Sequence, residues 1–261
     1  MSKTLAIASG KGGVGKTTIS VNLALIQANE TECLLLDADM GMANAHILLG
    51  INPKKTVRDV IEGSSTLESS IVKGPNKLNF LSGGSGITEL LSIDKNKKYN
   101  FIRSFESLTG KINDLIVDVS AGADELALNM LSASDKILIV LVNEPTSFMD
   151  AFTLIKACNL ELKFKEFCIV TNMVNSENQG NKIFEKFNNI VTKFYDVNLT
   201  HVGSLLNMQE IKDSVLKKNP VVLDKENKNV INSFKRLLKN INNAPLNEHS
   251  GIKFFNNSIK A

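Results

Sequence analysis

The stretch Ala8-Ser-Gly-Lys-Gly-Gly-Val-Gly-Lys-Thr-Thr18 decides the fold of this chain. It fits the phosphate-binding loop pattern G-x-x-x-x-G-K-[ST]. In such a loop, glycines let successive backbone N–H groups surround an anion, and the following helix aims its positive end at the same point. We therefore expect this segment to bind the phosphates of a nucleoside triphosphate through Gly10, Lys11, Gly12, Gly13, Val14, Gly15, Lys16, Thr17 and Thr18.

The sequence around the loop has the right order of elements. Residues 3–9 predict a short buried strand, and residues 18–28 carry apolar side chains at helical spacing. In this setting Lys16 would bridge the β- and γ-phosphates, and the Thr17 hydroxyl would ligate Mg²⁺. A glycine-rich turn that binds nothing is the alternative.

Composition places the chain among compact globular proteins. With 261 residues, of which 43% are hydrophobic and 22% charged, it suits one α/β domain. The net charge of +3 comes from interleaved lysines and acids, which argues against a general nucleic-acid binder. Cys33, Cys158 and Cys168 predict reduced, buried thiols. Because we find neither a leader nor a bilayer-spanning apolar run, we expect a soluble cytoplasmic protein.

Apolar strands alternate with helices along the chain. Strands are predicted at residues 32–36, 78–81, 115–118, 136–142, 167–173 and 197–206, with short helices on either side of Gly50 and Pro53 and a long one over residues 224–241. This order predicts an α/β fold with a mainly parallel sheet and helices on both faces. We expect an ATPase domain over residues 1–243 and a tail over 244–261.

Carboxylates stand where predicted strands end. Asp37 and Asp39 follow one apolar strand, and Asp118 ends another. Because residues two apart in a strand point the same way, Asp37 and Asp39 should both face the metal and the γ-phosphate if the strand continues through them. Asp37 has a second interpretation, as a cap of the next helix. The glycine run that begins at Gly83 could be a second phosphate site, although a strand-to-helix loop explains it better.

Lys11 indicates which class of phosphate-binding loop this is. The loop Lys11-Gly-Gly-Val-Gly-Lys-Thr17 resembles the deviant Walker A motif of the MinD/ParA ATPases. The resemblance implies a P-loop NTPase that binds ATP and Mg²⁺ and hydrolyses ATP slowly. It also implies an ATP-dependent homodimer in which Lys11 and Lys16 are catalytic, Lys11 by reaching the partner's nucleotide. A solvated surface lysine is the alternative for Lys11.

The same resemblance assigns the two switch regions. Asp37 would hold the water shell of the metal, and Asp39 would position the attacking water with Asn44 nearby. Asp118-Val-Ser-Ala-Gly122 fits the family's switch II pattern, in which Asp118 orients a metal-bound water and Gly122 is a hinge.

Further segments resemble one branch of the family, the MinD-like flagellar-number regulators of the FlhG/FleN type. They are Leu35 to Asn44, Leu48 to Ile61 and Ser82 to Ile87. In the family, an Asn at the position of Asn172 reads the adenine edge, although Asn is also a common turn residue. Leu205 and Leu206 stand at the adenine-side backbone contacts, where relatives usually carry a proline. Relatives often carry an N-terminal segment that engages a partner GTPase, for which Met1-Ser2-Lys3 leaves no room.

The function expected from the resemblance is an ATP-dependent switch that regulates flagellar number or placement. Its partners would be a flagellar GTPase, flagellar switch proteins or a flagellar transcription regulator. Alternatives are a MinD-like division-site ATPase, a ParA-like DNA- or cargo-positioning ATPase, an iron–sulfur carrier, a tyrosine-kinase relative and a non-enzymatic nucleotide-binding adaptor. DNA binding would need a basic stripe, an iron–sulfur cluster would need paired thiolates, and a kinase relative would need a tyrosine-rich tail.

The C-terminal tail, residues 244–261, is a candidate for membrane binding. On a helix, Ile252, Phe255 and Ile259 would share one face, as in an interfacial membrane anchor. Two such tails on one ATP-bound dimer would bind far better than one. We therefore expect peripheral binding to the inner face of the membrane in the ATP state. A disordered tail and a tail docked on its own subunit are the alternatives.

Overall fold

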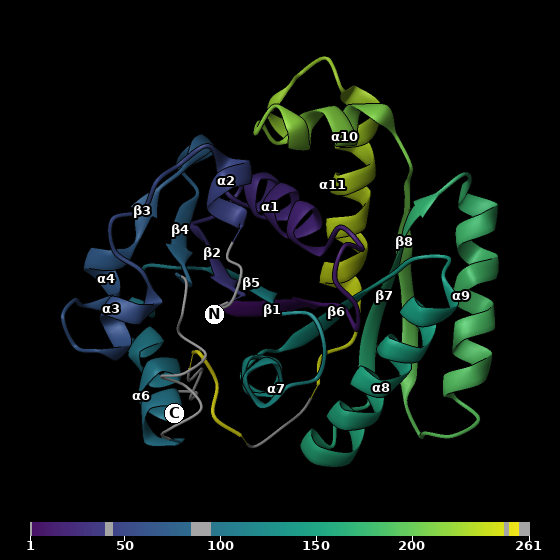
Figure 1. The fold of residues 1–261 in the computed structure, drawn as a ribbon, viewed down its shortest axis with the longest axis horizontal. Coiled ribbons are helices and arrows are strands. Elements are labelled where there is room, and N and C mark those ends of the chain that lie inside the picture. Colours follow the sequence, from purple (N-terminus) through teal and green to yellow (C-terminus); the bar gives the residue numbers. More distant parts are fainter. Residues whose placement is uncertain (1, 40–43, 85–94, 248–250, 256–261) are drawn as a thin grey trace.

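The computed structural model describes residues 2–39, 44–84, 95–247 and 251–255. Within them, one eight-stranded sheet has the order β3-β4-β2-β5-β1-β6-β7-β8 (Figure 1). The β3–β4 pair is antiparallel, and the other described pairs are parallel. The strands are β1 (Lys3–Ala8), β2 (Cys33–Ala38), β3 (Val72–Lys73), β4 (Asn79–Ser82), β5 (Asp114–Val119), β6 (Lys136–Leu141), β7 (Glu166–Val174) and β8 (Asn198–Leu206).

Helices cover both faces of this sheet (Figure 1). They are α1 (Lys16–Gln27), α2 (Ala45–Leu49), α3 (Val57–Ile61), α4 (Leu67–Ser70), α6 (Lys95–Ser104), α7 (Glu125–Ser132), α8 (Pro145–Leu162), α9 (Glu177–Val191), α10 (Gln209–Leu216) and α11 (Lys228–Asn243). Short 3₁₀ turns add η1 (Pro75–Lys77), η2 (Phe105–Leu108) and η3 (Val221–Leu223). None of these helices has the length and apolar character needed to cross a membrane.

Alternation along the central strands divides the core into two layers. In β1, Ala6 and Ala8 face the layer built with α6, α7, α8 and α9, whereas Leu5 and Ile7 face the layer built with α1 and α11. Because both faces are covered, apolar residues point to both faces of the central strands instead of alternating regularly with polar ones. The predicted fold class, a mainly parallel α/β sheet with helices on both faces, is confirmed.

The predicted start of the last helix is wrong by one turn. Residue 224 was expected to open it, but α11 begins at Lys228. The Asp224 carboxylate accepts from the backbone N–H of Glu226 and the side-chain amide of Asn227. A local turn of this kind competes with the helix for the same backbone groups. The glycine run at Gly83 lies largely outside the described residues, which resume after residue 84 at 95.

The described part of the tail lies against its own subunit. Residues 251–255 do not form a helix in this structure of the single subunit, and the remainder of that segment, 256–261, is outside the described residues. Phe254 and Phe255 are buried in the core layer of α6 and α8, with the Phe254 ring 4.9 Å from that of Phe105. Lys253 pairs with Asp135 at 3.1 Å. These contacts are those of a tail docked on its own subunit, which was the alternative to a membrane anchor.

Asn247 fixes the beginning of this tail. Its side-chain oxygen accepts from the backbone N–H groups of Lys165 and Glu166, and its amide nitrogen donates to the Glu166 carbonyl. Its own backbone N–H donates to the carbonyl of Asp135. The tail therefore reaches the far side of the sheet through specific hydrogen bonds.

Candidate functional site

The phosphate loop connects β1 to α1 and is tightly surrounded. A Cβ on Gly10 would lie 2.1 Å from the backbone carbon of Asp150, so glycine lets α8 approach the loop directly. Gly15 has φ of 87°, where L side chains are strained, and a Cβ there would lie 2.5 Å from the Asn172 amide nitrogen. That amide donates to the Val14 carbonyl at 2.8 Å. Close packing from α8 and β7 thus shapes the loop.

Lys16 lies behind the loop in a buried ion pair. Its ammonium donates to Asp118 Oδ1 at 2.8 Å, and the side chains are 8% and 0% exposed. The Ser20 hydroxyl donates to the same oxygen at 2.8 Å, whereas Asp118 Oδ2 is buried without a hydrogen-bond partner among the described residues. The phosphate-binding lysine and the switch II carboxylate, distant in sequence, are therefore neighbours.

Asp37 faces Asp118 across the pair of parallel strands β2 and β5, where the two residues are in register. Burial, and then repulsion by Asp118, raise the pKa of Asp37 to about 7. Its carboxylate accepts from the backbone N–H groups of Asp39 and Ala45, at 3.2 and 2.9 Å. Because Ala45 opens α2, Asp37 also has the helix-capping contact that was the alternative interpretation.

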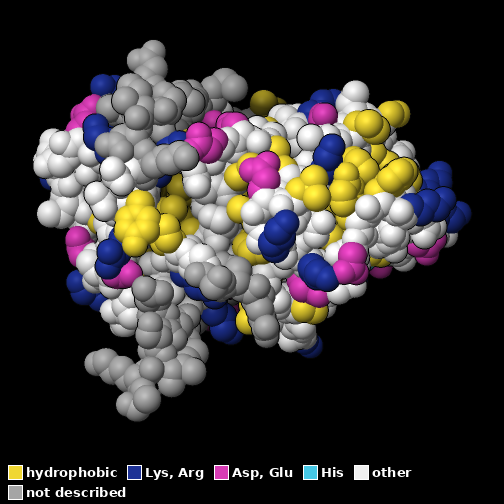
Figure 2. All heavy atoms as spheres, turned by 90° about the horizontal axis from the view of Figure 1, so that it is seen from below, with side chains coloured by type: hydrophobic (Ala, Val, Ile, Leu, Met, Phe, Trp, Pro, Cys, Tyr) yellow, Lys and Arg dark blue, Asp and Glu magenta, His cyan; other side chains and the backbone are white. Residues whose placement is uncertain are grey.

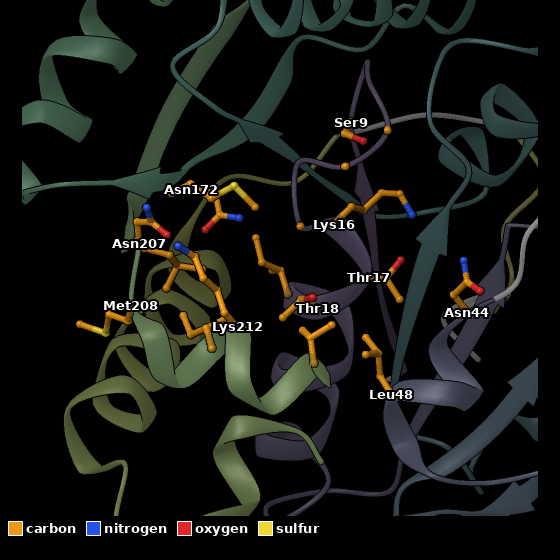
Figure 3. A pocket seen from close by; sticks show the side chains of 18 of the residues that line it. Ser9, Lys16, Thr17, Thr18, Asn44, Leu48, Asn172, Asn207, Met208 and Lys212 are labelled. Atoms are coloured by element: carbon orange, nitrogen blue, oxygen red, sulfur yellow. The ribbon is translucent and has the colours of Figure 1, made fainter. Parts of the chain in front are cut away.

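A cavity of about 740 Å³ extends from the phosphate loop to α10. The predicted residues that line it are Lys11, Gly12, Gly13, Gly15, Lys16, Thr17, Thr18, Asp39, Asn44, Asn172, Leu205 and Leu206. The other four, Gly10, Val14, Asp37 and Asp118, lie behind its surface. Figure 3 shows Thr17, Thr18 and Asn44 on one side of this cavity and Asn172 on the other. Residues 40–43, between Asp39 and Asn44, are outside the described residues.

Lys11 is the exposed cation of the loop. Its side chain is 40% exposed and donates to Glu144 Oε2 at 2.6 Å and to Thr146 Oγ1 at 3.2 Å. Both partners stand at the start of α8. No signal in the sequence joins Lys11 to Glu144, which lies 133 positions further along the chain.

The part of the cavity formed by β7, β8 and α10 was also only partly predicted. Asn172 and Leu206 were expected there, but Met173, Asn207, Met208 and Lys212 line it too (Figure 3). They come from β7, from the connection between β8 and α10, and from α10. A lysine on an amphipathic helix is normally taken for a solvent-facing residue, which is why Lys212 gave no signal.

Comparison with known proteins agrees with this geometry. A family model described as "ParA: NUBPL iron-transfer P-loop NTPase" matches residues 1–242. This chain belongs to the ParA family of P-loop NTPases. The three cysteines of this ParA-family protein are free and buried, on β2, α8 and β7.

Two curated relatives of the ParA-family chain have flagellar names. The antiactivator FleN of Pseudomonas aeruginosa is 32% identical over 97% of this chain and 91% of its own length. The flagellum site-determining protein YlxH of Helicobacter pylori is 30% identical over 80% of this chain and 71% of its own. Among solved structures, the MinD cell division protein of Aquifex aeolicus superposes with a TM-score of 0.76 at 23% identity, covering 97% of this chain and 100% of that one. The resemblance to the MinD/ParA class, and to FlhG/FleN within it, is confirmed.

Proposed function

We propose that this chain is an ATPase that dimerises around Mg·ATP and, in that state, regulates the number or placement of flagella at the membrane. The observation that carries the proposal is the contrast between the two lysines of the loop. Lys16 is buried beside a carboxylate, whereas Lys11 stands at the surface, where a second subunit can reach it. The proposal has four parts: nucleotide hydrolysis, dimerisation, flagellar control and membrane binding.

The carboxylates fit a divalent cation. Asp118 has a buried oxygen without a hydrogen-bond partner in the described chain, and its repulsion contributes to the raised pKa of Asp37. A cation between these groups would relieve both conditions. Thr17, Asp37 and Asp118 would hold Mg²⁺, which would supply charge neutralisation at the phosphates when bound. Lys16 would exchange Asp118 for the β- and γ-phosphates.

Hydrolysis would depend on Asp39. Its side chain lines the cavity and is half-buried, so it is accessible to a water molecule beside the phosphates. A carboxylate there can orient this water and accept its proton. Asn44 lies on the same wall and would help to position the water. Turnover is expected to be slow in the absence of a partner protein.

Dimerisation would give Lys11 a new partner. In the single subunit it pairs with Glu144 in an exposed ion pair, which contributes little because water screens it. The triphosphate of a second subunit carries more charge and offers more acceptors than one carboxylate. We therefore expect two subunits to enclose two nucleotides, each contacted by the Lys11 of the other.

The relatives support the flagellar part. FleN is named an antiactivator and YlxH a flagellum site-determining protein, and both match most of this chain. We propose that the ATP-bound dimer engages a flagellar transcription regulator, a partner GTPase or flagellar switch proteins. A MinD-like division role is the second candidate, since proteins named putative septum site-determining protein MinD match over 57–58% of the chain.

Counts of flagella and positions of septa in cells that lack the gene test this part. Complementation with the wild-type chain should restore flagellar number, and complementation with Asp39→Ala should not. Septum position should stay unchanged in all strains. Misplaced septa with normal flagella would support the division role, and loss of DNA or cargo positioning alone would support the ParA-like one.

Membrane binding is the remaining part of the proposal. The tail would exchange its docked position for a membrane-bound helix in the ATP dimer. Ile252 offers a clean test because it is 39% exposed in the docked tail and also belongs to the apolar face of the predicted helix. Ile252→Glu should leave folding intact but abolish ATP-dependent pelleting with phosphatidylethanolamine–phosphatidylglycerol vesicles. Leu246→Glu, outside that helix, is the matched control. Equal pelleting of Ile252→Glu and wild type would remove the membrane from the proposal.

A further inference from the structure

The part of the cavity formed by β7, β8 and α10, where the adenine base is expected and which we call the base end, contains a cation that the proposed mechanism does not use. Lys212 lies on α10 and extends towards Asn172 and Asn207 in Figure 3. Its surroundings on the cavity wall are apolar or neutral, including Met208 and Ile211. The phosphate loop lines the same cavity, and Asn172 connects the two regions because its amide donates to Val14 of the loop.

Lys212 differs from the two lysines of the phosphate loop in its pairing. Lys11 pairs with Glu144 and Lys16 with Asp118, whereas Lys212 has no ion-pair partner among the residues that the structure describes. An ammonium group has three donors and no acceptor, so a nearby ligand with free acceptors can satisfy it. The one carboxylate among the described lining residues is Asp39, which follows β2, whereas Lys212 lies on α10.

The amide of Asn172 supplies the complementary group. Its nitrogen donates to the Val14 carbonyl, and its oxygen accepts no hydrogen bond from the described residues. The base end therefore presents one acceptor and one cationic donor. Adenine carries a donor, its exocyclic amine, beside ring nitrogens that accept, and its π-face also attracts a cation. This pairing of groups matches that base.

We propose that Lys212 is a base-recognition residue, whose ammonium donates to a ring nitrogen of the bound purine while Asn172 accepts from the exocyclic amine. The inference rests on the proposed nucleotide site and deepens it. It also gives the adenine side a side-chain contact in a chain where Leu206 stands in place of the usual proline. The triphosphate needs no contribution from Lys212, since Lys16 and the loop N–H groups already face it.

Calorimetric titration of the full chain with ATP and with tripolyphosphate, both with Mg²⁺, tests this assignment. Tripolyphosphate has the charge of the nucleotide but no base. Lys212→Met keeps the length of the side chain and removes its charge. It should weaken ATP binding by about 10–150-fold, as expected for the loss of a charged hydrogen bond, and leave tripolyphosphate binding unchanged. Lys217→Met, five residues further along at the C-terminal end of α10 and outside the cavity lining, is the matched control and should bind both ligands normally.

Each result has a definite meaning. Equal weakening of ATP and tripolyphosphate would show that Lys212 serves the phosphates, and unchanged ATP binding would show that it serves neither; both results overturn the inference. Lys212→Arg should retain ATP binding because it keeps a cationic donor. A wild-type chain that does not bind ATP would instead overturn the proposed function itself.

Discussion

Two lysines of one short loop lie in opposite environments. Lys16 is almost completely buried and pairs with Asp118, which Ser20 also contacts. Lys11 is 40% exposed and pairs with Glu144 at the start of α8. The first pair connects the loop to the centre of the sheet, and the second connects it to a surface helix.

The opposite environments of Lys16 and Lys11 explain how one loop can contact nucleotides in two subunits. A buried lysine is preorganised and can act on the nucleotide of its own subunit, because little side-chain freedom remains to be lost. An exposed lysine in a weak surface pair can exchange partners at small cost. The same residue type therefore suits binding within the subunit at one position and contact between subunits at the other.

Substituting the two lysines in turn should give the largest and most different effects. Lys16→Ala should weaken ATP binding by about 10²–10⁴-fold, since a charged donor to two phosphates is lost. It should also lower the free energy of unfolding by up to about 3–5 kcal/mol, because Asp118 loses its buried cation. Lys11→Ala should bind ATP as the wild-type monomer does. Calorimetry and thermal melting measure both effects, and equal loss of binding in the two variants would contradict the distinction.

Asp39→Ala separates binding from turnover. ATP binding should persist because Asp39 is not among the phosphate contacts, whereas the rate of hydrolysis should fall by at least about 100-fold with the loss of the group that positions water. Phosphate release under saturating ATP measures the rate. Asp196→Ala, an exposed residue just before β8 and therefore at the opposite edge of the sheet, is the control and should hydrolyse ATP normally. Normal hydrolysis by Asp39→Ala would refute its role.

Glu144→Gln should have the smallest effect. Removal of the charge that holds Lys11 on its own subunit should lower the ATP-analogue concentration required for dimerisation by about two- to fivefold, the range expected for an exposed ion pair. Sedimentation across a titration of the analogue measures the shift. Glu161→Gln, near the other end of α8, should leave the concentration unchanged. A higher requirement in Glu144→Gln would mean that Glu144 supports the dimer instead of restraining Lys11.

The phosphate end of the site was predictable from sequence because its geometry is local. A strand, a glycine loop and a helix in direct succession place Lys16 and Thr17, and a parallel sheet brings Asp37 and Asp118 to the same edge. The partners of the exposed groups were not predictable. Glu144 is far from Lys11 in sequence, and nothing in the chain before folding distinguishes it from other surface acids.

The docked position of the tail was not predictable from the sequence either. Phe254 and Phe255 suit a membrane-bound helix and a docked extended segment equally well, because either buries the rings. Hydrophobic spacing alone cannot decide between two apolar environments. The docked position in the single subunit depends on the ring contact with Phe105 and on the hydrogen bonds of Asn247, whose partners come from distant elements.

The central claim is that Lys11 acts on the nucleotide of a second subunit. Analytical ultracentrifugation of the wild-type chain and of Lys11→Ala, each with and without a non-hydrolysable ATP analogue and Mg²⁺, tests it most directly. The account predicts a dimer only for the wild-type chain with the analogue, and monomers in the other three samples. A dimer without nucleotide, or a Lys11→Ala variant that dimerises as readily as wild type, would contradict it.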